Sequence, residues 1–331
     1  MPSFHKNTSG GASVSGGALA PRSRRGNTNQ ADGYWRGGAV GGLTPTLEYL
    51  VLAGGGGSGY ASGAPSVGGA GGGAGGYRSS VVGEYSGGLQ TAESLFVPVA
   101  GTQYTVTVGG GGGGQTNGSN SVFSTITSTG GGAGQYQATS TDGGSGAGYP
   151  EWYAWHYTQF GHPTLSPKQG SGGAADGLTG ASVFGNSIGG GSGGGAGGTW
   201  SATANGDKVG LSSVISGSSV GRGGGGGGSG YDGDNRINAW WQSFEGYSAT
   251  YNYQYGGGRG GLGGAGYAGE ANKGGGGGSG QNTASGGGSG VVILRYPDNY
   301  DAAATTTGSP TITVTGGFRI YVFDGSGSIT F

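Results

Sequence analysis

Cysteine is absent from this chain, so neither disulfides nor thiolate metal sites are available to it. Charge is scarce as well, because only 9% of the residues are charged and the formal net charge is −1. Phosphate binding needs a clustered basic surface, so we expect no nucleic acid as a partner. No apolar run approaches the length of a membrane span, and we expect no membrane insertion.

Glycine is what the chain has in excess, with 94 glycines and 10 prolines among 331 residues. That composition alone is typical of a disordered chain, because few side chains remain to offset the entropy of ordering the backbone. The chain also holds 19 tyrosines, 9 phenylalanines and 6 tryptophans, whereas disordered chains are poor in aromatics and rich in charge. We therefore expect an ordered protein.

Short strands are predicted where apolar and polar residues alternate. A continuous apolar run, GVVILRYPDNY over 290–300, predicts a strand buried on both faces that Pro297 ends. No segment has helical periodicity of useful length. The alternating segments are 47–52, 104–108, 120–126 and three strands within 311–331, the last with turns at Gly316-Gly317 and at 324–327.

Glycine runs such as 222–230 and 273–280 have no side chains with which to pack as ordinary strands. One ordered state suits them, the polyglycine II helix, which has three residues per turn and no internal hydrogen bonds. Without Cβ atoms, such helices approach closely and satisfy one another's backbone groups. The alternative is a set of flexible linkers. We predict an all-β fold with a glycine-rich core, in which polyglycine II helices pack between or beside short β-sheets, with little or no α-helix.

Three regions are distinguished by composition. Residues 1–46 are polar and locally basic, and we interpret them as an attachment arm that uses Arg22, Arg24, Arg25 and Arg36; the alternative is a solvated tail. Residues 47–296 form the glycine-rich body, with aromatic inserts at 149–170 and 231–255. Residues 297–331 are predicted to form a C-terminal β-meander.

The order of the motifs resembles a known family. The segment YLVLAGGGGSG is followed by YTVTVGGGGGG, by NGSNSVFSTITSTGGGG and, after more glycine blocks, by GGGSGVVILRYPD and GFRIYVFDGSGSITF. This order is similar to that of the glycine-rich domain of bacteriophage tail-fibre and tail-associated proteins, of the type found in phages of marine bacteria and cyanobacteria, over roughly 47–331. A related architecture is the tail-fibre-tip adhesin built on a polyglycine II sandwich, whose loops touch the host. The resemblance implies a virion protein. The chain has no coiled-coil heptads of a long fibre, so a short fibre or a tip is expected.

The two inserts hold 14 of the chain's aromatic residues. Tyrosine and tryptophan give a large, rigid contact area with a polar handle, as recognition loops require. The alternative is that these rings cap the ends of the glycine helices as small cores. We predict that the receptor-binding residues are Trp152, Tyr153, Trp155, Tyr157, Trp240, Trp241, Tyr247 and Tyr251.

Catalytic and metal-binding patterns are weak. Matches to the dinucleotide fingerprint are forced by composition, since no helix follows any of them. We expect His156 and His162 to make contacts within their loop rather than to bind a metal. We expect the Asp232–Asn235 segment to form a turn rather than a calcium site. Glu151 with Asp234 or Glu245 would be the only conceivable carboxylate pair. We therefore expect no enzyme, no cofactor and no metal.

The sequence thus predicts a bacteriophage short tail fibre or fibre-tip adhesin that binds a host-surface glycan, or a protein receptor. Its other partners would be virion or fibre subunits, and we expect it to be oligomeric. Residues 1–17 lack the apolar stretch of a secretory signal, so release by host lysis is expected for such a virion protein. The main alternative is a purely structural virion appendage or extracellular filament subunit without receptor binding. Ice binding is disfavoured by the bulky inserts.

Overall fold

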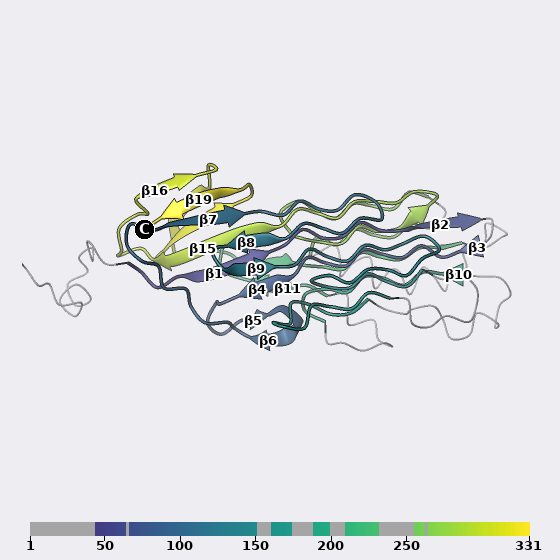
Figure 1. Cartoon of the computed structure of the whole chain (residues 1–331), viewed down its shortest axis with the longest axis horizontal. Coiled ribbons are helices and arrows are strands. Elements are labelled where there is room, and N and C mark those ends of the chain that lie inside the picture. Colours follow the sequence, from purple (N-terminus) through teal and green to yellow (C-terminus); the bar gives the residue numbers. More distant parts are fainter. Residues whose placement is uncertain are drawn as a thin grey trace, which may run out of the picture. The chain divides into compact units, whose positions relative to one another are not determined.

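The structure is a computed structural model, and it describes residues 44–63, 66–150, 160–173, 188–198, 209–231, 255–261 and 264–331. The chain divides into two compact units, Met1–Gly38 and Ala39–Phe331, and all of the described residues belong to the second unit. The strands of this second unit gather at one end, and long glycine segments run side by side from them toward β2 and β3 at the other end (Figure 1).

Two five-stranded antiparallel sheets form the strand-rich end. The first has the order β17 (Thr311–Thr315), β18 (Phe318–Phe323), β15 (Val291–Pro297), β1 (Glu48–Leu52) and β4 (Tyr77–Ser79). The second has the order β16 (Thr305–Thr307), β19 (Gly327–Thr330), β7 (Gln103–Thr107), β8 (Ser121–Phe123) and β9 (Ile126–Ser128).

Smaller pairings complete the regular structure. The strands β2 (Tyr60–Gly63), β3 (Ser66–Val67) and β14 (Gly280–Gln281) form a three-stranded sheet. The two-stranded pairs are β10 (Ile188–Gly189) with β13 (Gly230–Tyr231), β11 (Leu211–Ser213) with β12 (Val220–Arg222), and β5 (Tyr85–Ser86) with β6 (Gln90–Thr91), the last pair flanking a short 3₁₀ turn, η1 (Gly87–Leu89).

The central strands of the first sheet, β1 and β15, are buried on both faces, as the apolar run of β15 predicts. One face packs against the second sheet, and this inter-sheet core includes Val51, Leu294 and Tyr321 together with Phe123 and Ile329. The opposite face packs against loops and the β11–β12 hairpin. The members of that second core are Leu50, Leu52, Tyr77, Val81, Ala196, Ile215, Val291, Ile293 and Ile320. Alternate residues of β1 and β15 thus enter different cores, which is the period-two geometry of a strand.

The glycine segment 54–59 shows how the remainder of the body is held together. Its N–H groups donate in turn to three neighbours, with Gly54 and Gly57 bonding to 116–119, Gly55 and Ser58 to 285–288, and Gly56 and Gly59 to 70–73. Its carbonyl groups accept from three further segments, 112–115, 131–134 and the one that contains Gly277. The partner repeats every third residue, so the segment has six hydrogen-bonded neighbours around it.

Segment 69–76 repeats this pattern. Gly71 and Ala74 donate to 191–194, Gly72 and Gly75 to 274–277, and Gly73 and Gly76 to 129–132. Its carbonyl oxygens accept from 53–59, 145–148 and 226–229. A period of three residues without bonds inside the segment is the geometry of polyglycine II. The predicted all-β fold with packed polyglycine II segments beside short sheets is confirmed.

Close backbone approach explains why these segments are glycine. A Cβ placed on Gly72 would lie 2.1 Å from the carbonyl oxygen of Gly56, and one on Gly225 would lie 2.0 Å from that of Gly193. Real Cβ atoms do not come so near to backbone oxygens, so any side chain would push the segments apart. The serine and alanine side chains within these segments are buried as well: Ser58, Ala70 and Ala74 are all 0% exposed, and Ser58 Oγ donates to the carbonyl of Gly278 at 3.0 Å.

One predicted strand is a hairpin instead. Residues 120–126 were expected to form a single strand, but Ser124 adopts a left-handed conformation (φ 54°) and the chain reverses there. Phe123 and Ile126 consequently pair with each other and both enter the inter-sheet core. The C-terminal strands occur as expected, with the β17–β18 turn at Gly316-Gly317, but β19 leaves that hairpin and joins the second sheet.

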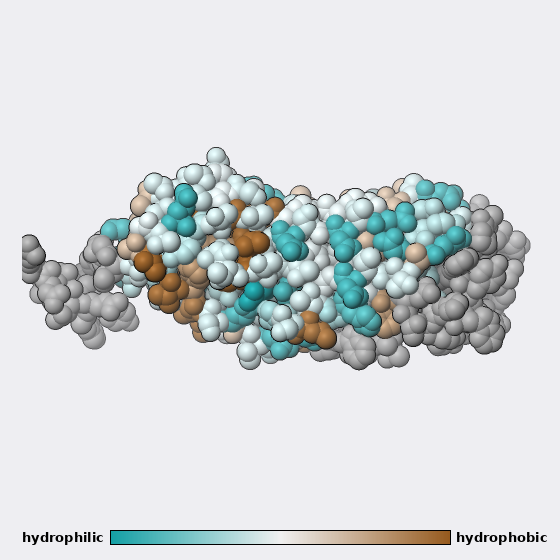
Figure 2. Space-filling model, viewed as in Figure 1, coloured by the Kyte–Doolittle hydropathy of each residue, from teal (hydrophilic) through white to brown (hydrophobic). Residues whose placement is uncertain are grey.

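Hydrophobic residues on the visible surface gather mainly at the strand-rich end, while the glycine body is neutral or polar in hydropathy (Figure 2). The most exposed apolar side chains include Val82, Val97 and Val99 around the sheets, and Ile312 and Val314 on β17. The glycine body buries backbone rather than side chains, so its own surface offers few apolar groups.

Candidate functional site

The end of the glycine body opposite the large sheets carries aromatic and amide side chains on a glycine base. Figure 1 shows β2, β3 and β10 at this end; β14 pairs with β2, and the turn at 135–140 lies beside β2 through Tyr136. β14 pairs in parallel with β2, with Gly280 opposite Tyr60 and Gln281 opposite Ala61. Because both strands continue polyglycine II segments, these residues rest on a closely packed base.

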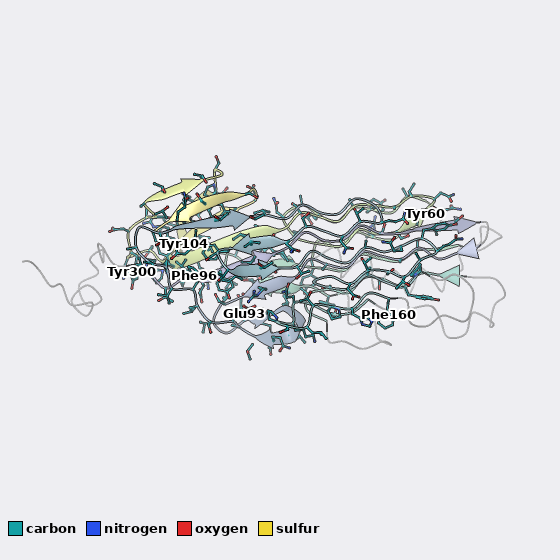
Figure 3. All side chains as sticks on the ribbon, viewed as in Figure 1. Tyr60, Glu93, Phe96, Tyr104, Phe160 and Tyr300 are labelled. Carbon is teal, nitrogen blue, oxygen red and sulfur yellow. The ribbon has the colours of Figure 1, made fainter. Side chains whose placement is uncertain are left out.

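Two tyrosines form the centre of this surface. The rings of Tyr60 and Tyr136 stack with centroids 4.2 Å apart and an interplanar angle of 13°, and both residues are half-buried. Figure 3 places Tyr60 at this end of the body. The turn that carries Tyr136 is fixed by two bonds, since Tyr136 N donates to Gln115 Oε1 (3.1 Å) and Gln135 Nε2 donates to the Gln115 carbonyl (3.1 Å).

Uncharged polar residues lie at the end of β14, the strand that pairs with β2. Gln281 lies opposite Ala61 in the sheet, one position beyond Tyr60, and Asn282 follows it with its backbone N–H bonded to the carbonyl of Ala61 at 2.7 Å. Amide side chains both donate and accept hydrogen bonds, and aromatic rings offer flat apolar faces. We call Tyr60, Tyr136, Gln281 and Asn282 the distal platform. Its chemistry suits a neutral, hydroxyl-rich ligand.

A second exposed aromatic lies on the outer segment at 264–270. The Arg259 guanidinium lies 4.7 Å from the centroid of the Tyr267 ring, and Tyr267 is 56% exposed. Tyr267 also bonds through its backbone to Arg259 and to Gly278, so the pair is fixed to the bundle surface. A cation over a tyrosine face is worth about 0.5–1 kcal/mol at exposed sites.

The first aromatic insert has its described ends side by side. Gly161 N donates to the carbonyl of Ala147 at 2.8 Å, and Tyr149 is only 7% exposed. The second insert is attached differently. Its start, Tyr231, pairs with Ile188, whereas the carbonyl of Tyr255 accepts from Gly224, at the other end of the same glycine run. At ~3.1 Å per residue these attachment points are roughly 20 Å apart.

None of the predicted site residues is described by the structure. The receptor-binding set lies outside the described residues, namely Trp152, Tyr153, Trp155, Tyr157, Trp240, Trp241, Tyr247 and Tyr251, and so does the attachment set, Arg22, Arg24, Arg25 and Arg36. The same holds for Glu151, His156, Asp232, Asp234, Asn235 and Glu245. Their roles stay predictions. The distal platform, in contrast, was missed, and its only sequence signal is a single tyrosine in each of GSGYASG and GQYQATS.

Of the predicted histidine pair, the structure describes His162. Its side chain is exposed, and its backbone N–H donates to Asp142 Oδ1 at 2.6 Å. Across the described ranges, no three His, Cys, Asp or Glu side chains gather as a metal site would need. Within those same ranges, no helix has the length and apolar character to cross a membrane.

Clear pKa shifts fall on residues of the sheets. Burial raises the pKa of Tyr77 above its usual range, and the nearby Glu84 carboxylate adds to the shift. Burial also lowers the pKa of Arg222. The buried atoms Tyr77 Oη, Glu84 Oε2, and Arg222 Nε and Nη1 have no hydrogen-bond partner among the described residues. This group is buried beneath the first sheet and forms part of its packing.

Comparison with known proteins agrees with the bundle geometry. A family model described as a glycine-rich domain matches residues 43–297, which include β1, the glycine segments and β15. Searches of curated proteins and of solved structures found no match. The family match covers well over half of the chain and spans the polyglycine II body, so this protein belongs to the glycine-rich domain family.

Proposed function

We propose that this protein is a bacteriophage virion component, a short tail fibre or fibre-tip adhesin that binds a host-surface glycan. The observation that carries the proposal is the combination of a backbone-bonded glycine body with aromatic side chains held at its surface. Each buried glycine segment bonds to as many as six neighbours, so the body is a stiff support. Long inserts on a stiff support are usually where binding resides.

The distal platform supports a glycan rather than a charged ligand. Its stacked rings and amide groups carry no net charge, and the chain as a whole has a formal net charge of −1. Sugars combine apolar ring faces with hydroxyl groups, which match aromatic faces and amide side chains respectively. The two aromatic inserts would add further rings of the same kind.

The test replaces tyrosines that are predicted to contact the ligand. Changing Tyr153, Tyr157, Tyr247 and Tyr251 to serine together is expected to abolish binding to host cells and to a glycan array. Each true contact should cost about 1–2 kcal/mol of binding or more. The melting temperature should change little. Tyr85, which is 58% exposed at the strand-rich end, provides the matched control, and Tyr85→Ser should bind normally.

If the protein is a structural appendage without receptor binding, the same variant should give the opposite result. If the quadruple variant unfolds or no longer assembles, while binding per assembled particle is intact, the tyrosines belong to a core or a subunit contact. The protein would then be a structural appendage without receptor binding. A second variant, Tyr60→Ser with Tyr136→Ser, asks separately whether the distal platform takes part in binding.

A further inference from the structure

The outer edge of β17 is an uncovered strand edge. Among the described residues, β17 is the end strand of the first sheet and pairs only with β18. All five of its residues are exposed, and Ile312 and Val314 are 48% and 53% exposed. The strand, TITVT, has no charge and no proline, and β-branched residues have high strand propensity.

Two other edges of the large sheets, at β4 and at β9, are covered by neighbouring segments. At the opposite edge of the first sheet, Tyr77 N donates to the carbonyl of Gln169, and Glu93 N donates to the carbonyl of Ser79. At β9, one of the two edge strands of the second sheet, the carbonyl of Thr127 accepts from the Arg78 side chain at 3.3 Å. Proteins usually protect free edges with charge, proline or covering loops, because a free edge recruits another strand.

The two exposed apolar side chains of β17 point to the face that elsewhere forms the inter-sheet core. Ile312 is paired with Tyr321, a member of that core, and Val314 with Arg319 on the same face. The second sheet does not cover them, since both remain about half exposed. Ile312 and Val314 therefore lie at an open flank of the two-sheet sandwich, where a further strand would continue the core.

We propose that β17 is a self-association edge, at which two copies of this chain pair antiparallel, β17 against β17. A two-fold axis through Thr313 sets Ile312 of each copy opposite Val314 of the other, and Thr311 opposite Thr315. The strand is therefore self-complementary in sequence and in charge. The pairing joins two five-stranded sheets into one of ten strands, and it covers four apolar side chains.

A second copy fits this edge better than a charged partner does, because TITVT offers no charge for such a partner to recognise. A single strand pair makes an interface below ~1,200 Å², so the free protein should dimerise weakly and in a concentration-dependent way. The inference goes beyond the proposed function, since it concerns the strand-rich end of the protein and needs neither host nor glycan.

The test uses two variants of the full chain with like charges on the edge. Ile312→Lys with Val314→Lys, and Ile312→Glu with Val314→Glu, each set equal charges opposite each other across the two-fold axis. Sedimentation equilibrium of wild type should show a monomer–dimer equilibrium, and each variant should weaken association more than tenfold. An equimolar mixture of the two variants should restore dimers containing one copy of each, because lysine then faces glutamate in both pairs.

The matched control is Val97→Lys with Val99→Lys, which charges two exposed valines on a loop, 70% and 65% exposed, outside β17. It should dimerise as wild type does, and all variants should keep the circular dichroism and melting of the native protein. The proposal is overturned if wild type stays monomeric up to its solubility limit. It is equally overturned if the like-charged variants associate normally, or if their mixture does not recover dimers.

Discussion

Single buried tyrosines set the behaviour of this protein at high pH. Tyr49, Tyr77 and Tyr296 are at most 2% exposed, and burial raises the pKa of each above the ordinary value of 10.0. Their folded-state pKa is above that of the unfolded chain, so their contribution to stability is complete below pH 10 and is lost as pH rises beyond it. Each of these tyrosines should lower the free energy of unfolding by about 1.4 kcal/mol per pH unit above 10, up to its folded-state pKa. Urea unfolding measured from pH 8 to pH 12 would show this loss.

Two tyrosine-to-phenylalanine changes separate burial from hydrogen bonding. Tyr296 Oη is bonded to the carbonyl of Asp301 (3.1 Å) and to Tyr321 Oη (3.0 Å), so Tyr296→Phe should destabilise by about 1 kcal/mol at pH 7. Tyr77 Oη has no partner among the described residues, so Tyr77→Phe should cost less. Both changes should make the free energy of unfolding fall less steeply with pH above 10, because each removes one titrating group. Equal costs at pH 7 would contradict this ranking.

At the scale of the element, the glycine segment is stabilised by the absence of side chains. Gly225→Val puts a Cβ where the carbonyl oxygen of Gly193 lies 2.0 Å away, and neither backbone moves without breaking its neighbours' bonds. Inserting extra groups into a packed interior costs about 1–3 kcal/mol. We expect at least the upper value here, because the clash is with backbone.

Gly110 gives the matched control for that prediction. It lies in another glycine segment, but it is exposed, and a Cβ added there meets no atom within 4 Å. Gly110→Ala should therefore leave the melting temperature unchanged or raise it slightly, because alanine restricts the unfolded chain. Gly225→Ala should lower it clearly. If both substitutions were tolerated equally, close packing of the segments would not be what selects glycine.

The elements also show how far sequence reasoning reaches. The apolar run at 291–297 and the glycine blocks were predictable, because each composition fits only one kind of ordered structure. The identity of neighbouring glycine segments was not, since glycine runs carry no side chains that distinguish them. Their register depends on the strands that precede them and on contacts such as Ser58 Oγ with Gly278. The Tyr60–Tyr136 stack was missed for the same reason, because its two tyrosines come from different segments.

At the scale of the whole molecule, the boundary between the two units shows where a truncation can be made to test the predicted attachment arm. The predicted arm covers residues 1–46 and the predicted body begins at Leu47, which is buried and exchanges backbone hydrogen bonds with Phe96 at 2.8 and 3.0 Å; Pro45 is also buried. The division of the chain at Gly38 and the family match from residue 43 both put the body's start before these residues. Deletion of residues 1–38 is therefore the cleaner experiment.

The truncated protein should fold and melt as the full chain does, because it keeps every described contact. If residues 1–38 attach the protein to its carrier, truncated copies should be missing from purified particles when detected by immunoblot. A full-length variant with Arg22, Arg24, Arg25 and Arg36 changed to alanine then asks whether the basic groups carry the attachment. Particles that incorporate the truncated protein at the normal level would show that the arm is only a solvated tail. A truncated protein that fails to fold would instead show that residues 1–38 stabilise the body.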